Sequence, residues 1–362
     1  MGELDFKQKL LTTNYKEWIA NFSHGNMCIP QIIELDPTSN CNYSCNCCIN
    51  SDIINKNGFI SKNILLKFID DFAEMGGMGI IFIGGGEPLM YPDFGEILKY
   101  VYNKGIKFGI TTNGFFIDQY LYEIANYSSW TRISVDAASK KMYDIVRPCK
   151  YEKSYERVLK NIDRLSKDKT GVLGFSYLLL EDKGFTNVDE IVKAAKLARD
   201  LGCDYFELKP MVDENHFLYR YSKGLLEKLH EKVFQLNDLK SESFNIIYAN
   251  SIDQYSESKL TQPKSYDYCP SAYLRNVVTN YGVFPCPYKR GNQKFNMGSI
   301  NTGLKEFMYS KDREHILETL DPKVDCKHFC IRNEVNEFLQ AIKEGNISVS
   351  DCNFVSSEDV FV

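Results

Sequence analysis

Two hydrophobic periods alternate along residues 32–208. Short runs rich in Ile, Val and Phe are typical of buried strands, and between them apolar residues recur every three or four positions, which is typical of amphipathic helices. The predicted strands are Ile32–Leu35, Gly79–Ile83, Lys107–Thr111, Trp130–Val135, Val172–Leu179 and Tyr205–Leu208. The predicted helices are Ser61–Met75, Phe94–Asn103, Ser154–Leu165 and Val188–Leu201.

This strand–helix alternation predicts a parallel sheet with helices packed outside it. Six units are fewer than the eight of a closed barrel, so we expect an α/β fold with a partial (β/α)6 barrel, open on one side. After Met211 the pattern changes to a single helix, a polar connector and a segment that carries four cysteines. We therefore expect a helical extension at 1–28, the barrel at 29–215, a helix and connector at 216–266, a small cysteine-rich subdomain at 267–335, and a helix and tail at 336–362.

Composition narrows the possible partners. A net charge of −5 weighs against a nucleic-acid partner, and no apolar run approaches the length of about 20 residues that crosses a bilayer. Met1–Gln8 shows no signal-peptide pattern. In a reducing compartment, twelve cysteines are more often metal ligands or catalytic groups than disulfides. We expect a cytoplasmic protein that binds metal and has neither a nucleic-acid nor a membrane partner.

Three of these cysteines, Cys41, Cys45 and Cys48, follow the first predicted strand with the spacing C-x3-C-x2-C. Such thiolates can hold three irons of a four-iron cluster and leave the fourth iron open, since a fully ligated cluster takes four cysteines. A zinc site and a loop of reduced thiols remain alternatives for this spacing.

Further polar motifs follow the next strands. Gly84–Pro88 comes after the second strand, Thr112–Gly114 after the third and Asp136 after the fourth. Alone, a Gly-Gly-Glu-Pro sequence is more often a tight turn than a binding site. Because the carboxyl ends of parallel strands share one edge, however, we expect all of these motifs on the same rim as the cysteines.

Together, the cysteine triplet and Gly85-Gly86-Glu87-Pro88 resemble the radical S-adenosylmethionine (SAM) superfamily. The resemblance implies that the cysteines carry a [4Fe–4S] cluster, that SAM fills the open iron, and that the Gly-Gly-Glu-Pro turn binds the SAM amino group. The further positions that it implies as SAM contacts are Thr112, Asn113, Ser134, Asp136 and Arg147.

One position departs from this family's pattern. The residue before the last cysteine, which usually is aromatic and contacts the adenine through its backbone, is Cys47 here. Adenine packing therefore stays open, and Cys47 is also a possible competitor for iron.

The family's chemistry begins with one electron passed from the reduced cluster to SAM. An electron donor such as flavodoxin or ferredoxin is implied. The 5′-deoxyadenosyl radical that forms can remove hydrogen from an unactivated C–H bond, so the site must exclude water.

The second cysteine set resembles the twitch subdomain, a shortened SPASM domain that carries one auxiliary [4Fe–4S] cluster. Its members are Cys269, Cys286, Cys326 and Cys330. A structural zinc ribbon is the alternative, because it needs the same four thiolates.

The two-cluster layout implies an enzyme that oxidises a small polar metabolite, such as an amino sugar or cyclitol, with the auxiliary cluster as electron acceptor. An epimerase or a peptide-modifying enzyme is the alternative within the superfamily, and a non-enzymatic zinc protein is the alternative outside it. The residues that we expect to face the substrate are Tyr177, Glu207, Lys209 and Arg290, with Lys209 foremost because it ends the sixth strand on the functional rim.

Overall fold

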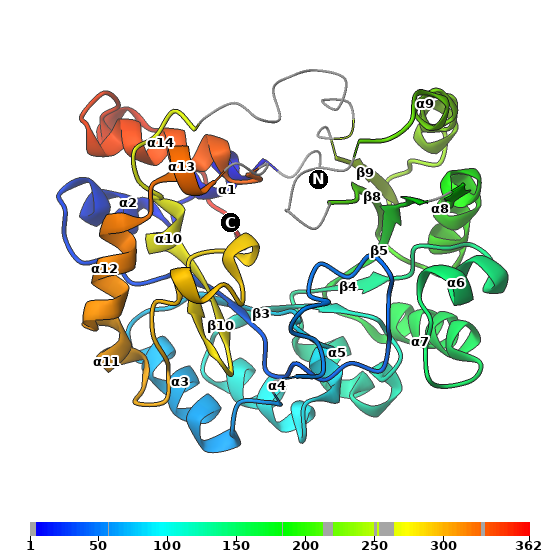
Figure 1. Cartoon of the computed structure of the whole chain (residues 1–362), viewed down its shortest axis with the longest axis horizontal. Coiled ribbons are helices and arrows are strands. Elements are labelled where there is room, and N and C mark those ends of the chain that lie inside the picture. Colours follow the sequence, from blue (N-terminus) through cyan, green and yellow to red (C-terminus); the bar gives the residue numbers. More distant parts are fainter. Residues whose placement is uncertain are drawn as a thin grey trace.

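A nine-stranded sheet curves through the molecule and carries helices on its outer face (Figure 1). The computed structural model describes residues 5–56, 58–182, 184–212, 220–249, 252, 264–326 and 330–362. The strand order is β11-β10-β1-β2-β3-β4-β5-β8-β9, and every neighbouring pair is parallel except β10–β11. The strands span Ile32–Leu35 (β1), Gly79–Phe82 (β2), Lys107–Thr112 (β3), Trp130–Ser134 (β4), Val172–Leu179 (β5), Tyr205–Pro210 (β8), Asn245–Tyr248 (β9), Arg275–Thr279 (β10) and Gly282–Phe284 (β11).

The six predicted strands are confirmed, and they form an open barrel. Three further strands lengthen the sheet beyond this core: β9 extends it past β8, and the β10–β11 hairpin extends it past β1. A separate two-stranded ribbon pairs Glu181–Asp182 (β6) with Phe185–Thr186 (β7). The predicted boundary at residue 215 and residues 253–263 of the predicted connector lie outside the described residues.

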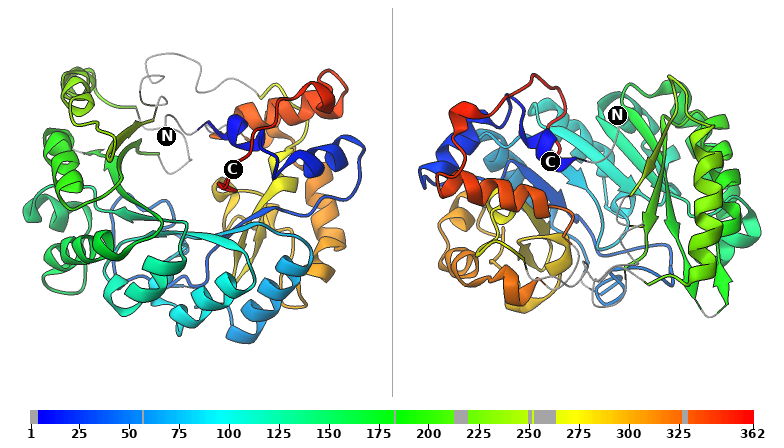
Figure 2. Two further views of the ribbon diagram at one scale, coloured as in Figure 1. Left: turned by 180° about the vertical axis from the view of Figure 1, so that it is seen from behind. Right: turned by 90° about the horizontal axis from the view of Figure 1, so that it is seen from above.

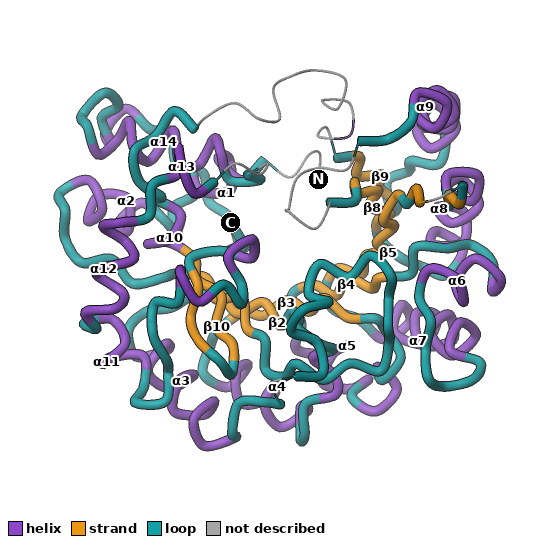
Figure 3. Tube along the Cα trace, viewed as in Figure 1, coloured by secondary structure: helices purple, strands orange, loops and turns teal. Residues whose placement is uncertain are grey.

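The helices of the barrel follow the strands in sequence and cover their outer side (Figures 1 and 3). They are α3 (Lys62–Glu74), α4 (Phe94–Asn103), α5 (Leu121–Tyr127), α6 (Lys140–Val146), α7 (Ser154–Asp168), α8 (Ile191–Asp200) and α9 (Lys223–Asn237). In α3 the apolar side chains Leu65, Phe68, Ile69 and Phe72 are fully buried, because their spacing places them on the face that meets the sheet. β1 and β2 are buried along their whole length, as expected for strands covered on both sides.

The two ends of the chain pack together in a second apolar core. It joins α1 (Phe6–Leu10) and α2 (Lys16–Ser23) to α14 (Asn333–Lys343), with Trp18 stacked on Phe22 at 5.2 Å between ring centroids. The N-terminal helices thus lie beside the C-terminal part of the chain (Figure 2). Shorter helices complete this region: α10 (Ser271–Leu274), α11 (Leu304–Met308), α12 (Lys311–Thr319) and α13 (Pro322–Asp325).

The C-terminal tail fills the amino-terminal end of the barrel. Val360 and Phe361 pack against Ile32 and Ile81, and the ring of Phe361 meets the edge of Trp130 at 5.7 Å. The tail approaches β2 so closely that a side chain at Gly79 would contact both Phe361 and Val360. The tail therefore packs on the end of the barrel opposite the rim that carries the cysteine loop.

In the described part of the chain, no helix is both long enough and apolar enough to cross a membrane.

We predict that replacing Phe361 with alanine destabilises the protein by about 3 kcal/mol, since it removes a buried ring and leaves a cavity. The urea unfolding midpoint measures this. Phe234→Ala is the matched control, because Phe234 is 76% exposed, and such a surface change should stay within about 0.5 kcal/mol. Equal midpoints for the two variants would contradict the tail's role in the core.

Candidate functional site

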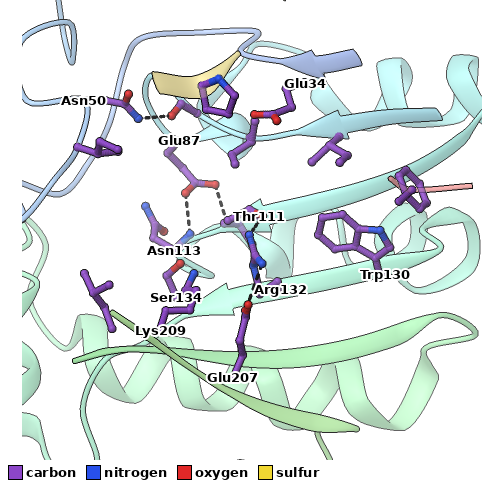
Figure 4. Close-up of a pocket in the computed structure, with 18 of the residues that line it drawn as sticks. Glu34, Asn50, Glu87, Thr111, Asn113, Trp130, Arg132, Ser134, Glu207 and Lys209 are labelled. Atoms are coloured by element: carbon purple, nitrogen blue, oxygen red, sulfur yellow. Dashed lines mark hydrogen bonds and ion pairs between the residues drawn. The ribbon is translucent and has the colours of Figure 1, made fainter. Parts of the chain in front are cut away.

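A cavity of about 1000 Å³ lies inside the curve of the sheet, and its lining runs from the amino ends of the strands, at Lys107 and Val172, to their carboxyl ends, at Thr112 and Lys209. Figure 4 draws part of this lining. Most of the residues predicted from the sequence line it. They are Cys41, Cys45, Cys47, Cys48, Gly85, Gly86, Glu87, Thr112, Asn113, Ser134, Asp136, Arg147, Glu207, Lys209 and Arg290. Segments more than 200 residues apart in sequence therefore share one chamber.

The cysteine loop is shaped by bonds to its own backbone. The Cys41 N–H donates to Asn55 Oδ1 at 2.8 Å, and the Tyr43 N–H points at Cys41 Sγ at 3.4 Å. Tyr43 is buried, and its hydroxyl lies 2.8 Å from that of Tyr143. These contacts hold the thiols toward the cavity. Burial, and then the nearby Glu87 carboxylate, raise the pKa of Cys41 to about 12, so metal binding must displace a proton.

The donor set of this loop fits an open iron–sulfur cluster better than a single ion. Three thiols face one cavity, and burial also raises the pKa of Cys47, the fourth thiol on this wall, to about 12. Among the described residues, no three Cys, His, Asp or Glu side chains converge closely enough to hold a single metal ion. Three cysteines on one cavity wall are the number of protein ligands that a [4Fe–4S] cluster with one open iron needs.

The Gly84–Pro88 turn packs directly against the cysteine loop. A Cβ on Gly86 would lie 2.3 Å from the Asn40 carbonyl oxygen, so only glycine fits there. The Glu87 N–H donates to that same carbonyl at 2.8 Å. Pro88 begins the short 3-10 helix η1 (Pro88–Met90) and lies just outside the cavity lining.

Glu87 ties the turn to the end of β3. Its buried carboxylate accepts a hydrogen bond from the Asn113 N–H at 2.8 Å (Figure 4). It also accepts from the Thr112 hydroxyl at 2.6 Å and the Leu89 N–H at 3.1 Å. Burial raises the pKa of Glu87, and the bond from Asn113 opposes that rise. Glu87 therefore orders both loops that the family resemblance implies for SAM.

Asp136 and Arg147 form a buried ion pair at the end of β4. Asp136 adopts a left-handed backbone, with φ of 61°, which turns its carboxylate back to the Leu178 N–H at 2.7 Å and to Arg147 Nε at 2.8 Å. Arg147 Nη1 in turn lies 3.9 Å from Cys45 Sγ. The pair connects the fourth strand to the cysteine loop.

The deeper wall carries a second ion pair and a lysine. Arg132 binds Glu207 at 3.1 Å and the Thr111 hydroxyl at 3.3 Å (Figure 4). Lys209 lies beside them, and among the described residues it forms no hydrogen bond or ion pair. Burial, and then the charge of Arg132, lower the pKa of Lys209 to about 8. An unpaired amine that is half neutral near this pH can bind an anion or accept a proton.

Sequence analysis missed a third charged cluster, around Glu34 in β1. Glu34 Oε1 lies 2.7 Å from Arg275 and 3.1 Å from Arg332, and Oε2 lies 3.6 Å from Arg290. Burial alone would raise its pKa, but the three arginines lower the pKa of Glu34 to about 2. The sequence feature that could have indicated this cluster is a charged residue, Glu34, in the middle of an apolar strand. Arg132 in β4 shows the same feature.

The four downstream cysteines gather behind the cavity wall. Cys286 follows β11, and burial and then Cys330 raise the pKa of its thiol to about 11. Burial raises the pKa of Cys269, and the other three thiols of the set add to this rise, so all four lie within electrostatic reach. None of the four lines the cavity, whereas Tyr288 and Arg332 from the same segment do.

Two predicted substrate residues have other contacts. Tyr177 is fully buried outside the cavity, and its hydroxyl donates to the Asn187 carbonyl at 2.6 Å, so it packs the sheet against its helices. Strand alternation explains this, because Tyr177 and Ser176 point to opposite faces of β5. Arg290 reaches the cavity, but its guanidinium is engaged with Asp36 at 2.8 Å.

Residues 35–183 match the family profile described as Radical SAM superfamily. These residues form a radical SAM domain. Members of this superfamily use a [4Fe–4S] cluster and SAM, and the cysteine loop and glycine-rich turn described above lie within the matched residues.

Known proteins that are similar in sequence to this chain have several different activities. It is 29% identical over 176 residues to the AdoMet-dependent heme synthase of Methanosarcina barkeri, covering 48% of each protein. It is 24% identical over 312 residues to the GTP 3′,8-cyclase of Helicobacter pylori, covering 81% of this chain and 88% of that one. The chain thus spans only about half the length of the first relative.

Among solved structures, Streptococcus suis SuiB bound to S-adenosylmethionine superposes with a TM-score of 0.63 at 14% identity. The match covers 95% of this chain and 80% of SuiB. At this identity the likeness shows a shared fold.

We predict that Glu87→Gln destabilises the protein by about 1–3 kcal/mol, because an amide leaves one of three buried donors without an acceptor. SAM affinity, measured by anaerobic equilibrium dialysis, should fall in the same variant. Glu96→Gln is the control, since Glu96 is 70% exposed and pairs with Lys62 on the surface. A urea midpoint for Glu87→Gln that equals the control's would show that the carboxylate does not order the turn.

Proposed function

We propose that this protein is a two-cluster radical SAM oxidoreductase that removes two hydrogens from a small polar metabolite, such as an amino sugar or cyclitol. The observation that carries the proposal is the position of Lys209, an unpaired amine in the same cavity as the three-cysteine loop. The four-cysteine set behind the Tyr288 side of that cavity supplies the second half of the argument.

Each residue group has a distinct part in this reaction. When bound, the [4Fe–4S] cluster and SAM supply a 5′-deoxyadenosyl radical that removes one hydrogen atom from a substrate carbon. The hydrogen bonds of Glu87 hold the glycine-rich turn against the end of β3. The Asp136–Arg147 ion pair holds the end of β4 beside the cysteine loop. The apolar ring of Phe361 lines the cavity near the amino ends of the strands.

Oxidation then requires two further acceptors. A carbon radical that bears a hydroxyl or amine becomes a carbonyl or imine when it loses one electron and one proton. Lys209 would take the proton as a neutral amine, and the four downstream cysteines would hold an auxiliary cluster, which when bound would supply the electron acceptor. With four cysteine ligands this cluster has no open iron, so electron transfer suits it better than substrate binding.

The size of the cavity favours a small substrate. About 1000 Å³ is at the upper end of small-molecule sites, and SAM must occupy part of it. A peptide is the second candidate, because SuiB, whose fold the chain shares over 95% of its length, has a structure bound to its precursor peptide SuiA. Epimerisation is the alternative outcome for either substrate. A small electron-transfer protein, such as flavodoxin or ferredoxin, would deliver the first electron.

We predict that the anaerobically reconstituted protein binds about eight iron atoms and cleaves SAM to 5′-deoxyadenosine after reduction. Replacing Cys41, Cys45 and Cys48 with alanine should leave about four iron atoms and abolish cleavage. Replacing Cys269, Cys286, Cys326 and Cys330 should also leave about four, with cleavage retained and substrate oxidation lost. Zinc in place of iron at either set, measured by metal analysis, would overturn the proposal.

We predict that oxidation increases as the pH rises through about 8, because Lys209 must be neutral to accept a proton. Its charged neighbours on the surrounding strands and loops are Arg132, Glu207, Asp136 and Arg147. Lys209→Met should lower product formation at least about 100-fold, while SAM cleavage without oxidised product persists. Product is measured as a mass loss of two hydrogens across a panel of amino sugars and cyclitols.

Lys209→Arg separates the two possible roles of this lysine. Arginine keeps the positive charge but cannot give up its proton in this pH range. Loss of product in Lys209→Arg agrees with proton acceptance, whereas full activity would show that Lys209 only binds an anion.

A further inference from the structure

The part of the chain predicted as the cysteine-rich subdomain, 267–335, is called the auxiliary segment below. Arg290 lies where this segment meets the barrel. It follows η6 (Pro287–Lys289), four residues after Cys286, and its side chain is only 4% exposed. Its Nε atom lies 2.8 Å from Asp36 Oδ2, and Nη1 donates to Asn50 Oδ1 at 3.2 Å. Nη2 lies 3.6 Å from Glu34 Oε2. One guanidinium therefore contacts three side chains from the first 50 residues of the chain.

Two of these partners lead directly to the SAM site. Asn50 comes two residues after Cys48, and its amide donates to the Gly84 carbonyl at 2.7 Å (Figure 4). Asp36 lies against the next residue of the turn, since a Cβ on Gly85 would sit 3.1 Å from Asp36 Oδ2. Arg290 thus reaches the cysteine loop through Asn50, and the glycine-rich turn through both Asn50 and Asp36.

The Asp36 charge depends on Arg290. Asp36 is 1% exposed, and the positive charge nearest to its carboxylate is Arg290, with the Gly85 backbone N–H as a further favourable contact. Burial raises the pKa of Asp36 to about 7, although Arg290 opposes that rise. Loss of the guanidinium would leave a buried carboxylate uncompensated next to the turn.

Arginine has the geometry that this junction requires. Its planar guanidinium lets Nη1 donate to Asn50 while Nε and Nη2 lie within ion-pair distance of Asp36 and Glu34. A lysine has one nitrogen, so it cannot reach Asp36, Asn50 and Glu34 together.

We propose that Arg290 is a positioning residue that holds the auxiliary segment against the cysteine loop and the Gly84–Gly86 turn, so that SAM binding depends on this docking. The inference rests on the proposed function only in assigning the downstream cysteines to a second cluster. The contacts of Arg290 with Asp36 and Asn50 stand without it.

Arg290→Met tests the proposal. We expect both clusters to assemble, SAM affinity to fall about tenfold or more, and the change that SAM causes in the electron paramagnetic resonance signal of the reduced cluster to shrink. Arg290→Lys should recover at most a small part of this loss, because it restores the charge without the fork. Iron content and SAM equilibrium dialysis are measured on the same anaerobic samples.

Arg275→Met is the matched control. Arg275 also pairs with Glu34, at 2.7 Å, but its hydrogen bonds go to Glu34 and the Val362 carbonyl, and it contacts neither Asp36 nor Asn50. SAM affinity in this variant should stay within about twofold of the parent protein. An equal loss in Arg275→Met and Arg290→Met would overturn the proposal, because the effect would then come from charge balance around Glu34.

Asn50→Leu keeps the test decisive if Arg290→Met fails to fold. It leaves every buried charge paired and removes only the bonds to Arg290 and the Gly84 carbonyl. We expect the same loss of the SAM-dependent spectral change, and an unchanged SAM response would overturn the proposal. If the parent protein carries only one cluster, the proposed function fails, while a weakened SAM response in Arg290→Met would still support the positioning role.

Discussion

Charges inside the barrel have to be paired, and this requirement connects the fold to the site. The strands carry several charged side chains inward, where the surroundings are too apolar to leave them without partners. Arg132 pairs with Glu207, Asp136 with Arg147, and Glu34 with arginines from the C-terminal part of the chain. The interior of the barrel is therefore a set of matched ion pairs rather than a purely apolar core.

Pairing also explains how the auxiliary segment is held. β10 lies beside β1 in the sheet, and Arg275 on β10 reaches Glu34 directly. Arg332 comes from beyond the last of the four downstream cysteines and reaches the same carboxylate. A buried acid in the first strand thus pairs with arginines from two distant parts of the C-terminal region. The contacts that reach the cysteine loop and the glycine-rich turn are those of Arg290 with Asn50 and Asp36. Among the described residues on the inward faces of the strands, Lys209 has no such partner, which is why we propose it as the proton acceptor.

Much of this arrangement is predictable from local sequence. Strand and helix periods predict the six-stranded core, and the order of the motifs predicts that Cys41, Glu87 and Asp136 share one rim, because parallel strands end at the same edge. The position of β10 is different. Its neighbour is β1, more than 200 residues earlier, and the ion pairs that favour this pairing join residues with no local relation.

The direction in which a strand side chain points was the second feature that limited prediction of the site residues. Tyr177 lies on a strand that contributes to the cavity, yet it faces the helices, since alternate residues point to opposite sides. Glu207 and Lys209 share the inward face of β8 and both line the cavity, so their predicted contact with substrate stays a prediction. For Arg290 the sequence predicts a position near the auxiliary segment, but only three-dimensional contacts reveal its bonds to Asp36 and Asn50.

The central claim is that Cys41, Cys45 and Cys48 hold a cluster with one open iron, while the downstream cysteines hold a cluster with none. Mössbauer spectroscopy of protein reconstituted with 57Fe, with and without SAM, tests both halves at once. The account predicts two [4Fe–4S] clusters, with roughly one iron in eight changing its signal when SAM is added. A spectrum that SAM leaves unchanged, or a protein without [4Fe–4S] clusters, would contradict it.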